Sequence, residues 1–122
     1  MRIKILGLII MILVWTSCTS KVIANFEIVN NTGHEIDSLK IEPNTSEMGK
    51  FISIKKEGKV KYKSDMTGIL KVDGAYELSF LLNKQKKTMW FGYYTNGYPL
   101  EKVTKIVMER DTILINQIFG NY

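Results

Sequence analysis

The sequence contains very little Cys and His, the residues that form disulfides and zinc sites, and very little Pro. Its 122 residues include one Cys, one His and two Pro. A single Cys excludes an intrachain disulfide, and one Cys with one His cannot complete a zinc site. The sequence also lacks a Gly-x-Ser-x-Gly elbow, a phosphate-binding loop and a pair of His residues at zinc-ligand spacing. We therefore expect a protein that is not an enzyme and that uses no metal or other cofactor.

The remaining titratable residues do not form a recognisable catalytic set. His34 follows the turn signal Asn31-Thr32-Gly33 directly, so we expect an exposed loop histidine rather than a general base. Paired carboxylates can act without His, as they do in glycosidases. The acidic candidates for such a pair are Asp65, Asp73, Glu77 and Glu101. Nothing in their spacing pairs them, and Asp73 before Gly74 is typical of a turn.

The overall composition predicts one ordinary globular domain. Hydrophobic residues make up 45% of the chain and charged residues 24%, which are average values for folded proteins. The formal net charge is +5. Because the charges are unevenly spread, this value says little until the N-terminal segment is considered separately.

The first residues have the three parts of an export signal. Arg2 and Lys4 give a basic start, and residues 5–15 (ILGLIIMILVW) carry no charge. Small residues follow at Thr16 and Ser17, directly before Cys18. Eleven residues in a helix extend roughly 16 Å, about half of a bilayer's hydrocarbon core, so we do not expect a transmembrane helix.

The stretch Val14-Trp15-Thr16-Ser17-Cys18 resembles the lipobox of bacterial lipoproteins, with Trp15 where Leu is usual. The resemblance implies that the Cys18 thiol takes a diacylglyceryl group and that the chain is cut before Cys18. Acyl chains at this position would hold the protein on a membrane. The expected organisation is a signal peptide at 1–17, a lipidated Cys and short tether at 18–24, and one domain at 25–122. In the alternative, an ordinary signal peptidase cuts after Ser20 or Ala24.

Removal of residues 1–17 takes two positive charges with it, which leaves 15 Lys or Arg against 12 acidic residues, a net charge of +3. With this smaller charge and with export, we expect no nucleic-acid partner. The signal and Cys18 resemble those of small cell-envelope lipoproteins of Gram-negative bacteria, particularly of the Bacteroidota. In that group an acidic run after the Cys accompanies surface export. Residues 19–22 (TSKV) lack one, so we expect a periplasm-facing location.

The rest of the chain has the pattern of an all-β protein. Short apolar or alternating runs are separated by turn residues roughly every 8 to 12 positions. We predict a single antiparallel β-sandwich of about eight strands. A short helix at 99–108 is the competing prediction for one strand. The expected strands lie near residues 26–30, 36–41, 51–54, 59–63, 76–82, 89–94, 103–109 and 113–119.

Two local signals refine this prediction. A phase slip at Asp37-Ser38 predicts a β-bulge. Residues 73–78 (DGAYEL) resemble the Gly-x-Tyr-x-Leu strand entry of transthyretin-like sandwiches. The expected domain is therefore Ig-like or transthyretin-like.

Residues 55–63 hold five Lys and one Glu. Such a stretch could contact phosphate headgroups or an anionic glycan. The alternation of Lys59, Lys61 and Lys63 with Val60 and Tyr62 instead favours a solvated edge strand, because lysines protect the edge of a sheet.

The segment 90–98 (WFGYYTNGY) is the best candidate for recognition, because aromatic rings stack on sugars and on peptide side chains. The candidate ligand-binding residues are Trp90, Tyr93, Tyr94, Asn96 and Tyr98. In the alternative interpretation, Trp90 and Phe91 belong to the core and the tyrosines lie at the sheet margin.

The geometry of this segment can also be predicted. Regular alternation places Met89, Phe91 and Tyr93 on one face, and Trp90 and Tyr94 on the other. Gly92 would leave room for a ring or a backbone to approach. The pair Asn96-Gly97 predicts a type I′ turn.

These observations predict a lipid-anchored, non-enzymatic binding module of the cell envelope for a protein or a glycan. A second interpretation is an envelope-located inhibitor or immunity-type protein that inserts a loop such as residues 95–100 into an enzyme. A third is a structural subunit of an assembly.

Overall fold

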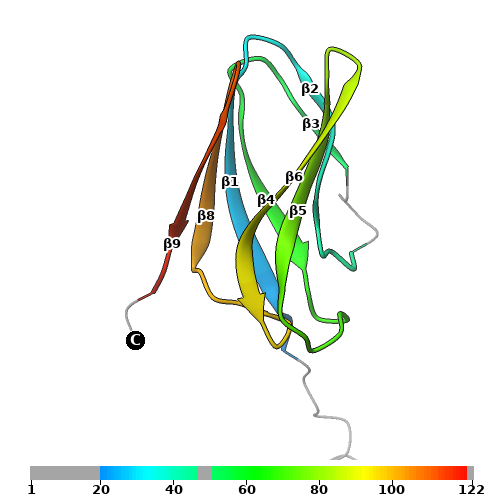
Figure 1. The fold of residues 1–122 in the computed structure, drawn as a ribbon, viewed down its shortest axis with the longest axis vertical. Coiled ribbons are helices and arrows are strands. Elements are labelled where there is room, and N and C mark those ends of the chain that lie inside the picture. The colour runs from blue at the N-terminus through cyan, green and yellow to red at the C-terminus, as the bar shows by residue number, and fades with distance from the viewer. Residues whose placement is uncertain (1–19, 47–50, 121–122) are drawn as a thin grey trace, which may run out of the picture.

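The computed structural model describes residues 20–46 and 51–120, which form two β-sheets packed face to face (Figure 1). The predicted signal peptide and Cys18 lie outside the described residues. The strands are β1 (Ile23–Asn31), β2 (Ile36–Glu42), β3 (Ile52–Ile54), β4 (Lys59–Asp65), β5 (Gly74–Leu82), β6 (Gln85–Thr95), β7 (Tyr98–Pro99), β8 (Val103–Glu109) and β9 (Ile113–Ile118). The prediction of an all-β sandwich is confirmed. None of the described residues belongs to a helix that could span a bilayer.

One sheet has the order β4-β1-β8-β9, and the other has the order β3-β2-β5-β6-β7. The prediction of purely antiparallel sheets is wrong, because β1 and β8 pair in parallel from Phe26 with Thr104 to Asn31 with Glu109. A parallel pair needs a long connection. Here that connection runs from β2 to β7 and comprises all five strands of the second sheet together with β4, so the chain returns to β1 only after it has formed the opposite layer.

The core lies between the sheets because alternate residues of each strand are apolar. In β1 every second residue from Ala24 to Asn30 is buried, and the residues between them are partly exposed. The ring of Phe26 lies edge-on to that of Tyr76 in the other sheet, with centroids 5.2 Å apart. Such aromatic pairs add to the stabilisation from burial alone. Phe26 therefore packs the first sheet against the second at the centre of the sandwich.

Several local predictions hold. Ser38 has φ of 49°, and the pairing of β2 with β5 shifts between Asp37 and Lys40, which confirms the bulge. Asn96 and Gly97 both have positive φ, as a type I′ turn requires. The lysine-bearing β4 lies at a sheet edge with Lys59, Lys61 and Lys63 exposed.

The strand predicted at 103–109 is confirmed as β8, and the competing helix at 99–108 is wrong, because β8 pairs with β1 and β9. Two boundaries differ from the prediction. The strand predicted at 89–94 begins earlier, at Gln85, so its connection to β5 is only the turn Asn83-Lys84, in which both residues have positive φ. The domain begins with β1 at Ile23, before the predicted start at residue 25, and Ala24 is already in the core.

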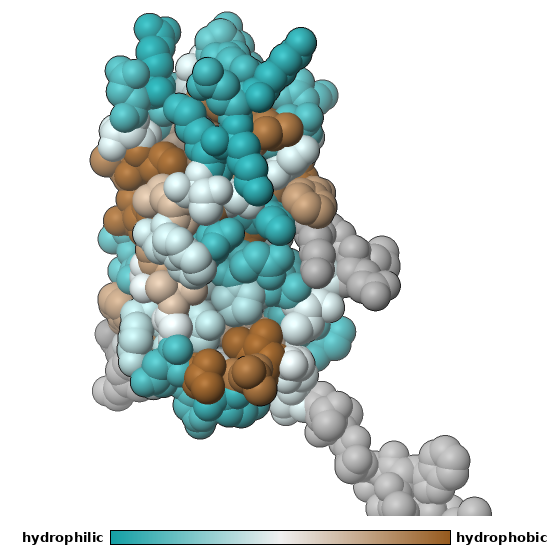
Figure 2. All heavy atoms as spheres, turned by 45° about the vertical axis from the view of Figure 1, so that its right-hand side comes forward, coloured by the Kyte–Doolittle hydropathy of each residue, from teal (hydrophilic) through white to brown (hydrophobic). Residues whose placement is uncertain are grey.

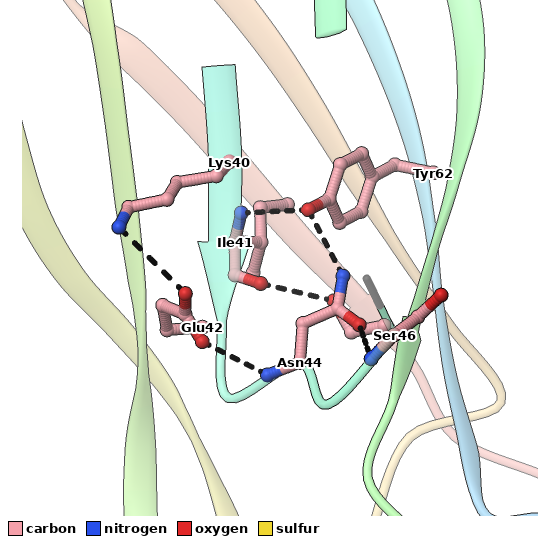
Figure 3. A network of polar contacts seen from close by, with 7 residues as sticks. Lys40, Ile41, Glu42, Asn44, Ser46 and Tyr62 are labelled. Carbon is pink, nitrogen blue, oxygen red and sulfur yellow. Dashed lines mark hydrogen bonds and ion pairs between the residues drawn. The ribbon is translucent and has the colours of Figure 1, made fainter. Parts of the chain in front are cut away.

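Polar side chains join the sheets at one side of the sandwich (Figure 3). The hydroxyl of Tyr62 in β4 accepts hydrogen bonds from the backbone N–H of Ile41, at 3.3 Å, and from Nδ2 of Asn44, at 3.1 Å. Ser64 of β4 donates to the carbonyl of Ile41 at 3.2 Å. These bonds tie β4 of one sheet to β2 of the other, so this side of the sandwich is closed.

A buried Asn organises the end of the sandwich at which β1 finishes. Nδ2 of Asn30 donates to the carbonyls of His34, Ile54 and Lys55 at 2.7 to 3.1 Å. Its Oδ1 accepts from the N–H and the hydroxyl of Thr32. One side chain thus joins the turn after β1 to the turn after β3. His34 itself is exposed, as predicted.

Candidate functional site

The aromatic segment 90–98 contains a bulge at Gly92. The pairing of β5 with β6 shifts between Tyr76 with Phe91 and Gly74 with Tyr94. Gly92 has φ of 64°, which L side chains rarely adopt. A Cβ at this position would lie 2.7 Å from Nε2 of Gln117 and 3.0 Å from Cδ2 of Tyr76. Glycine is therefore needed both for the backbone conformation and for the close approach of the Tyr76 ring.

The bulge reverses the predicted faces of the two tyrosines that follow it. Tyr94 is half-buried and packs against the core, with its ring centroid 5.5 Å from that of Tyr76. Tyr93 is exposed. The prediction that Tyr93 shares a face with Phe91 is wrong, because one extra residue in a strand moves every later side chain to the opposite face. Tyr94 is thus a packing residue at the margin of the core.

Trp90 lies before the bulge on the outer face of the second sheet, where 66% of its surface is exposed. The alternative that placed it in the core is therefore wrong, whereas Phe91 is buried as that alternative expected. The cross-strand neighbour of Trp90 is Glu77, and the neighbour of Glu77 on β2 is Glu42. An exposed indole therefore lies in one row with two carboxylates.

Asp73 holds the far end of the segment in place. Its carboxylate accepts hydrogen bonds from the hydroxyls of Tyr93 and Thr95, both at 2.8 Å, and from the N–H of Asn96 at 2.9 Å. The backbone N–H of Asn96 and these two hydroxyls lower the pKa of Asp73, and the Asp73 carboxylate raises the pKa of Tyr93. Tyr93 and Asn96 thus stabilise the turn within the chain.

Tyr98 and Gly97 are also engaged by the connection between β4 and β5. The N–H of Gly97 donates to the carbonyl of Val72 at 2.9 Å, and Nζ of Lys71 lies 4.6 Å from the centroid of the Tyr98 ring. The five candidate residues therefore do not converge on one concave site. They comprise one exposed outward ring, one packing residue, and three residues tied to 71–73.

A groove that the sequence did not predict opens between the two sheets, next to β6 and β9. Its volume is about 360 Å³. The apolar residues that line it are Phe80, Leu82, Met89, Met108 and Ile113, and Lys87, Glu109, Arg110 and Asp111 lie among its polar lining residues. Apolar alternation in β5, β6, β8 and β9 was the available signal. This alternation does not distinguish the wall of a groove from a closed core, because apolar residues line both.

The strands beside this groove have unpaired edges within the described part of the chain. β6 pairs with β5 along its length, and on its other side β7 pairs only with Tyr94 and Thr95. β9 is the last strand of its sheet. Backbone N–H and C=O groups at a free strand edge can pair with another strand. This side of the sandwich is therefore open, in contrast to the side joined by Tyr62.

The acidic candidates are scattered. Glu101 is 6% exposed, and its Oε1 accepts a hydrogen bond of 2.7 Å from the Tyr76 hydroxyl. Asp65 accepts from the N–H of Thr67, and Asp73 holds the turn described above. Across residues 20–46 and 51–120, no three His, Cys, Asp or Glu side chains are grouped to hold a metal ion.

No protein-family model matches this chain, and no curated protein and no solved structure shows significant similarity to it. The exposed residues and the groove are therefore the available basis for a functional proposal.

Proposed function

We propose that this protein is a lipid-anchored, non-enzymatic binding module of the bacterial cell envelope, built on an Ig-like or transthyretin-like sandwich and facing the periplasm. Cys18 carries the lipid in this proposal, and a protein partner occupies the groove between β6 and β9. The observation that carries the binding role is the combination of an apolar groove with unpaired strand edges beside it. An extended segment of a partner can add to such an edge through its backbone and place alternate side chains in the groove.

The contacts within the aromatic segment favour this protein partner over a glycan. Sugar recognition requires exposed rings together with free polar groups that converge on the ligand. Here Tyr93 and Asn96 are bonded to Asp73, and Tyr94 packs on Tyr76. The loop 95–100 of the inhibitor hypothesis is tied to residues 71–73 in the same way.

A glycan remains the second candidate because of one observation. Trp90 is exposed and lies beside Glu77, and an indole face next to a carboxylate can stack on a sugar and accept hydrogen bonds from its hydroxyls. This site would use the outer face of the second sheet, whereas the groove uses its inner face.

The lipid anchor is tested by metabolic labelling with a palmitate analogue in a Gram-negative host. We expect label on the wild type and none on Cys18→Ala. Equal labelling of the two would overturn the anchor.

The binding site is tested with a photo-crosslinking residue in place of Lys87, which lines the groove, and in place of Ser53 on the distant strand β3. We expect a discrete protein adduct in cells from position 87 and none from position 53. In the position 87 background, Met89→Glu should abolish the adduct and Trp90→Ala should leave it, because these neighbours point to opposite faces. Two results together would overturn the groove as the binding site and favour the outer face. These are loss of the adduct in Trp90→Ala but not in Met89→Glu, and binding of the wild type to a glycan array.

A further inference from the structure

The end of the sandwich at which the described chain begins has exposed apolar side chains. Leu70 is 79% exposed and Val72 is 53% exposed, both in the connection between β4 and β5, and Tyr98 of β7 is 48% exposed. Figure 2 shows a compact hydrophobic patch at this lower end, separated by hydrophilic surface from a second hydrophobic region at the upper left. Contiguous exposed apolar side chains indicate contact with another surface. We call Leu70, Val72 and Tyr98 the lower patch.

Hydrogen bonds place the lower patch beside the entry of the chain into the domain. The N–H of Val22 donates to the hydroxyl of Thr67 at 2.9 Å, and the N–H of Met66 donates to the carbonyl of Val22 at 2.8 Å. The connection that begins at Met66 contains Leu70 and Val72. Val72 in turn accepts from the N–H of Gly97, which immediately precedes Tyr98. These three parts of the chain therefore meet at one end of the sandwich.

The connection that carries Leu70 and Val72 has hydrogen bonds within its own backbone and to neighbouring segments. The N–H of Val72 donates to the carbonyl of Leu70 at 2.9 Å, and the neighbouring Asp73 is bonded to Tyr93, Thr95 and Asn96. The backbone polar groups of the connection are thus partly satisfied within the chain. A loop of this kind can enter a less polar environment at a lower desolvation cost than a loop without such bonds.

The charges at this end suit a membrane interface. Lys71 lies between Leu70 and Val72 with its ammonium over the Tyr98 ring, and Lys21 and Lys102 are also exposed. Of the nearby acidic groups, Asp73 is bonded as described, and Asp65 accepts from the N–H of Thr67. Apolar tips with lysines and a tyrosine beside them match the interfacial region of a bilayer, where phosphates attract cations and tyrosine is enriched.

Chain geometry limits the distance between this end and a lipid on Cys18. Three residues lie between Cys18 and Val22. A fully extended chain spans about 3.5 Å per residue step, so the four steps reach roughly 14 Å at most. This step depends on the lipid anchor that is part of the proposed function. With the anchor in place, the lower end of the sandwich is held close to the bilayer surface.

We infer that the lower end rests on the phospholipid membrane, with Leu70 and Val72 in the headgroup and upper acyl region and Lys71 near the phosphates. The groove lies near the opposite end, since its lining includes Thr32 after β1 and Arg110 after β8. In Figure 1 these turns lie at the top of the molecule, and the described chain begins at the bottom. This orientation therefore points the groove away from the membrane toward a partner.

The test uses the full chain, produced with its lipid in a Gram-negative host and reconstituted into phosphatidylethanolamine and phosphatidylglycerol vesicles. A single new Cys carries an environment-sensitive fluorophore, since the only native Cys is lipidated in this proposal. The probe position is Leu70→Cys. The matched control is Leu114→Cys, an exposed apolar residue on the outer face of the first sheet, and Lys84→Cys marks the opposite end.

We expect the Leu70 probe to shift its emission to shorter wavelength, to be quenched by spin-labelled lipid and to be protected from iodide. The probes at 114 and 84 should stay accessible to iodide and show neither effect. A Leu70 probe in water on a palmitate-labelled protein would overturn this orientation and leave the anchor intact. Lipid contact at Leu114 would also overturn it, because the molecule would then lie on its side. A protein without palmitate label would overturn the anchor and this orientation together.

Discussion

The hydroxyl of Tyr76 in β5 donates a buried hydrogen bond of 2.7 Å to Oε1 of Glu101, which lies in the connection between β7 and β8. Burial and the Glu101 carboxylate raise the pKa of Tyr76, so the phenol stays protonated and continues to donate. Oε2 of the same carboxylate has no hydrogen-bond partner among the described residues. The Glu101 carboxylate is almost fully buried, and Tyr76 donates a hydrogen bond to one of its two oxygens.

Tyr76→Phe should destabilise the protein by about 1 to 3 kcal/mol, because it removes the donor and leaves the buried carboxylate without its partner. Glu101→Gln should cost less, since the amide oxygen can still accept from Tyr76. Urea unfolding followed by far-ultraviolet circular dichroism measures both changes. A larger loss for Glu101→Gln than for Tyr76→Phe would contradict this interpretation.

The turn held by Asp73 should contribute a stability that depends on pH. The pKa of Asp73 is lowered in the folded protein, first by the N–H of Asn96 and then by the hydroxyls of Thr95 and Tyr93. An unfolded Asp titrates near pH 4, so the stabilisation is present above about pH 4 and is lost as the pH falls through the lower folded value. The melting temperature of wild type should therefore exceed that of Asp73→Asn at pH 7, and this difference should shrink toward about pH 2. A difference that does not change with pH would contradict the role of the carboxylate.

Alanine substitutions at three glycines distinguish the cost of an unfavourable backbone φ from the cost of a steric clash with the added Cβ. Gly92→Ala should destabilise the protein by about 2 kcal/mol or more, because φ is 64° and the new Cβ would meet Gln117 and Tyr76. Gly33→Ala has only the cost of its positive φ, since no atom lies within 4 Å of the added Cβ. Gly120→Ala has neither cost. Thermal unfolding should rank the losses Gly92 above Gly33 above Gly120, and equal losses at positions 92 and 33 would rule out the close contact.

Trp90 and Tyr94 should contribute differently to the stability of the protein, although both belong to the aromatic segment. Tyr94→Ala should destabilise the protein by about 2 to 3 kcal/mol, because its ring packs against Tyr76 at the margin of the core. Trp90→Ala should change stability by less than about 0.5 kcal/mol, since the side chain is mostly exposed. Guanidinium unfolding of the two variants measures both effects. A large loss for Trp90→Ala would show that the indole packs against the protein in solution.

Features governed by neighbours in the sequence were predictable. The alternation of Lys59, Lys61 and Lys63 with Val60 and Tyr62 reports a strand with one wet face, and β4 is such a strand at a sheet edge. The turn at Asn96-Gly97 was also predictable, because positive φ at two successive residues selects these amino acids.

The candidate site was less predictable because its geometry depends on distant residues. A glycine in a strand permits a bulge, but the bulge at Gly92 is fixed by the approach of Tyr76 and Gln117 from other strands. Without these contacts, regular alternation is the natural expectation, and it assigned Tyr93 and Tyr94 to the wrong faces. The buried role of Glu101 likewise depends on Tyr76, which lies 25 residues away in the sequence.

The sequence alone determined that the described domain is all-β, where most strands lie and which strand has a lysine-protected edge, because each of these follows from patterns within a few residues. The tertiary structure decided which aromatic side chains point outward, that a groove opens between β6 and β9, and that Leu70 and Val72 lie beside the entry of the chain. These features arise where segments far apart in the sequence meet, as Val22 and Thr67 do across 45 residues. Short-range periodicity carries no information about such encounters.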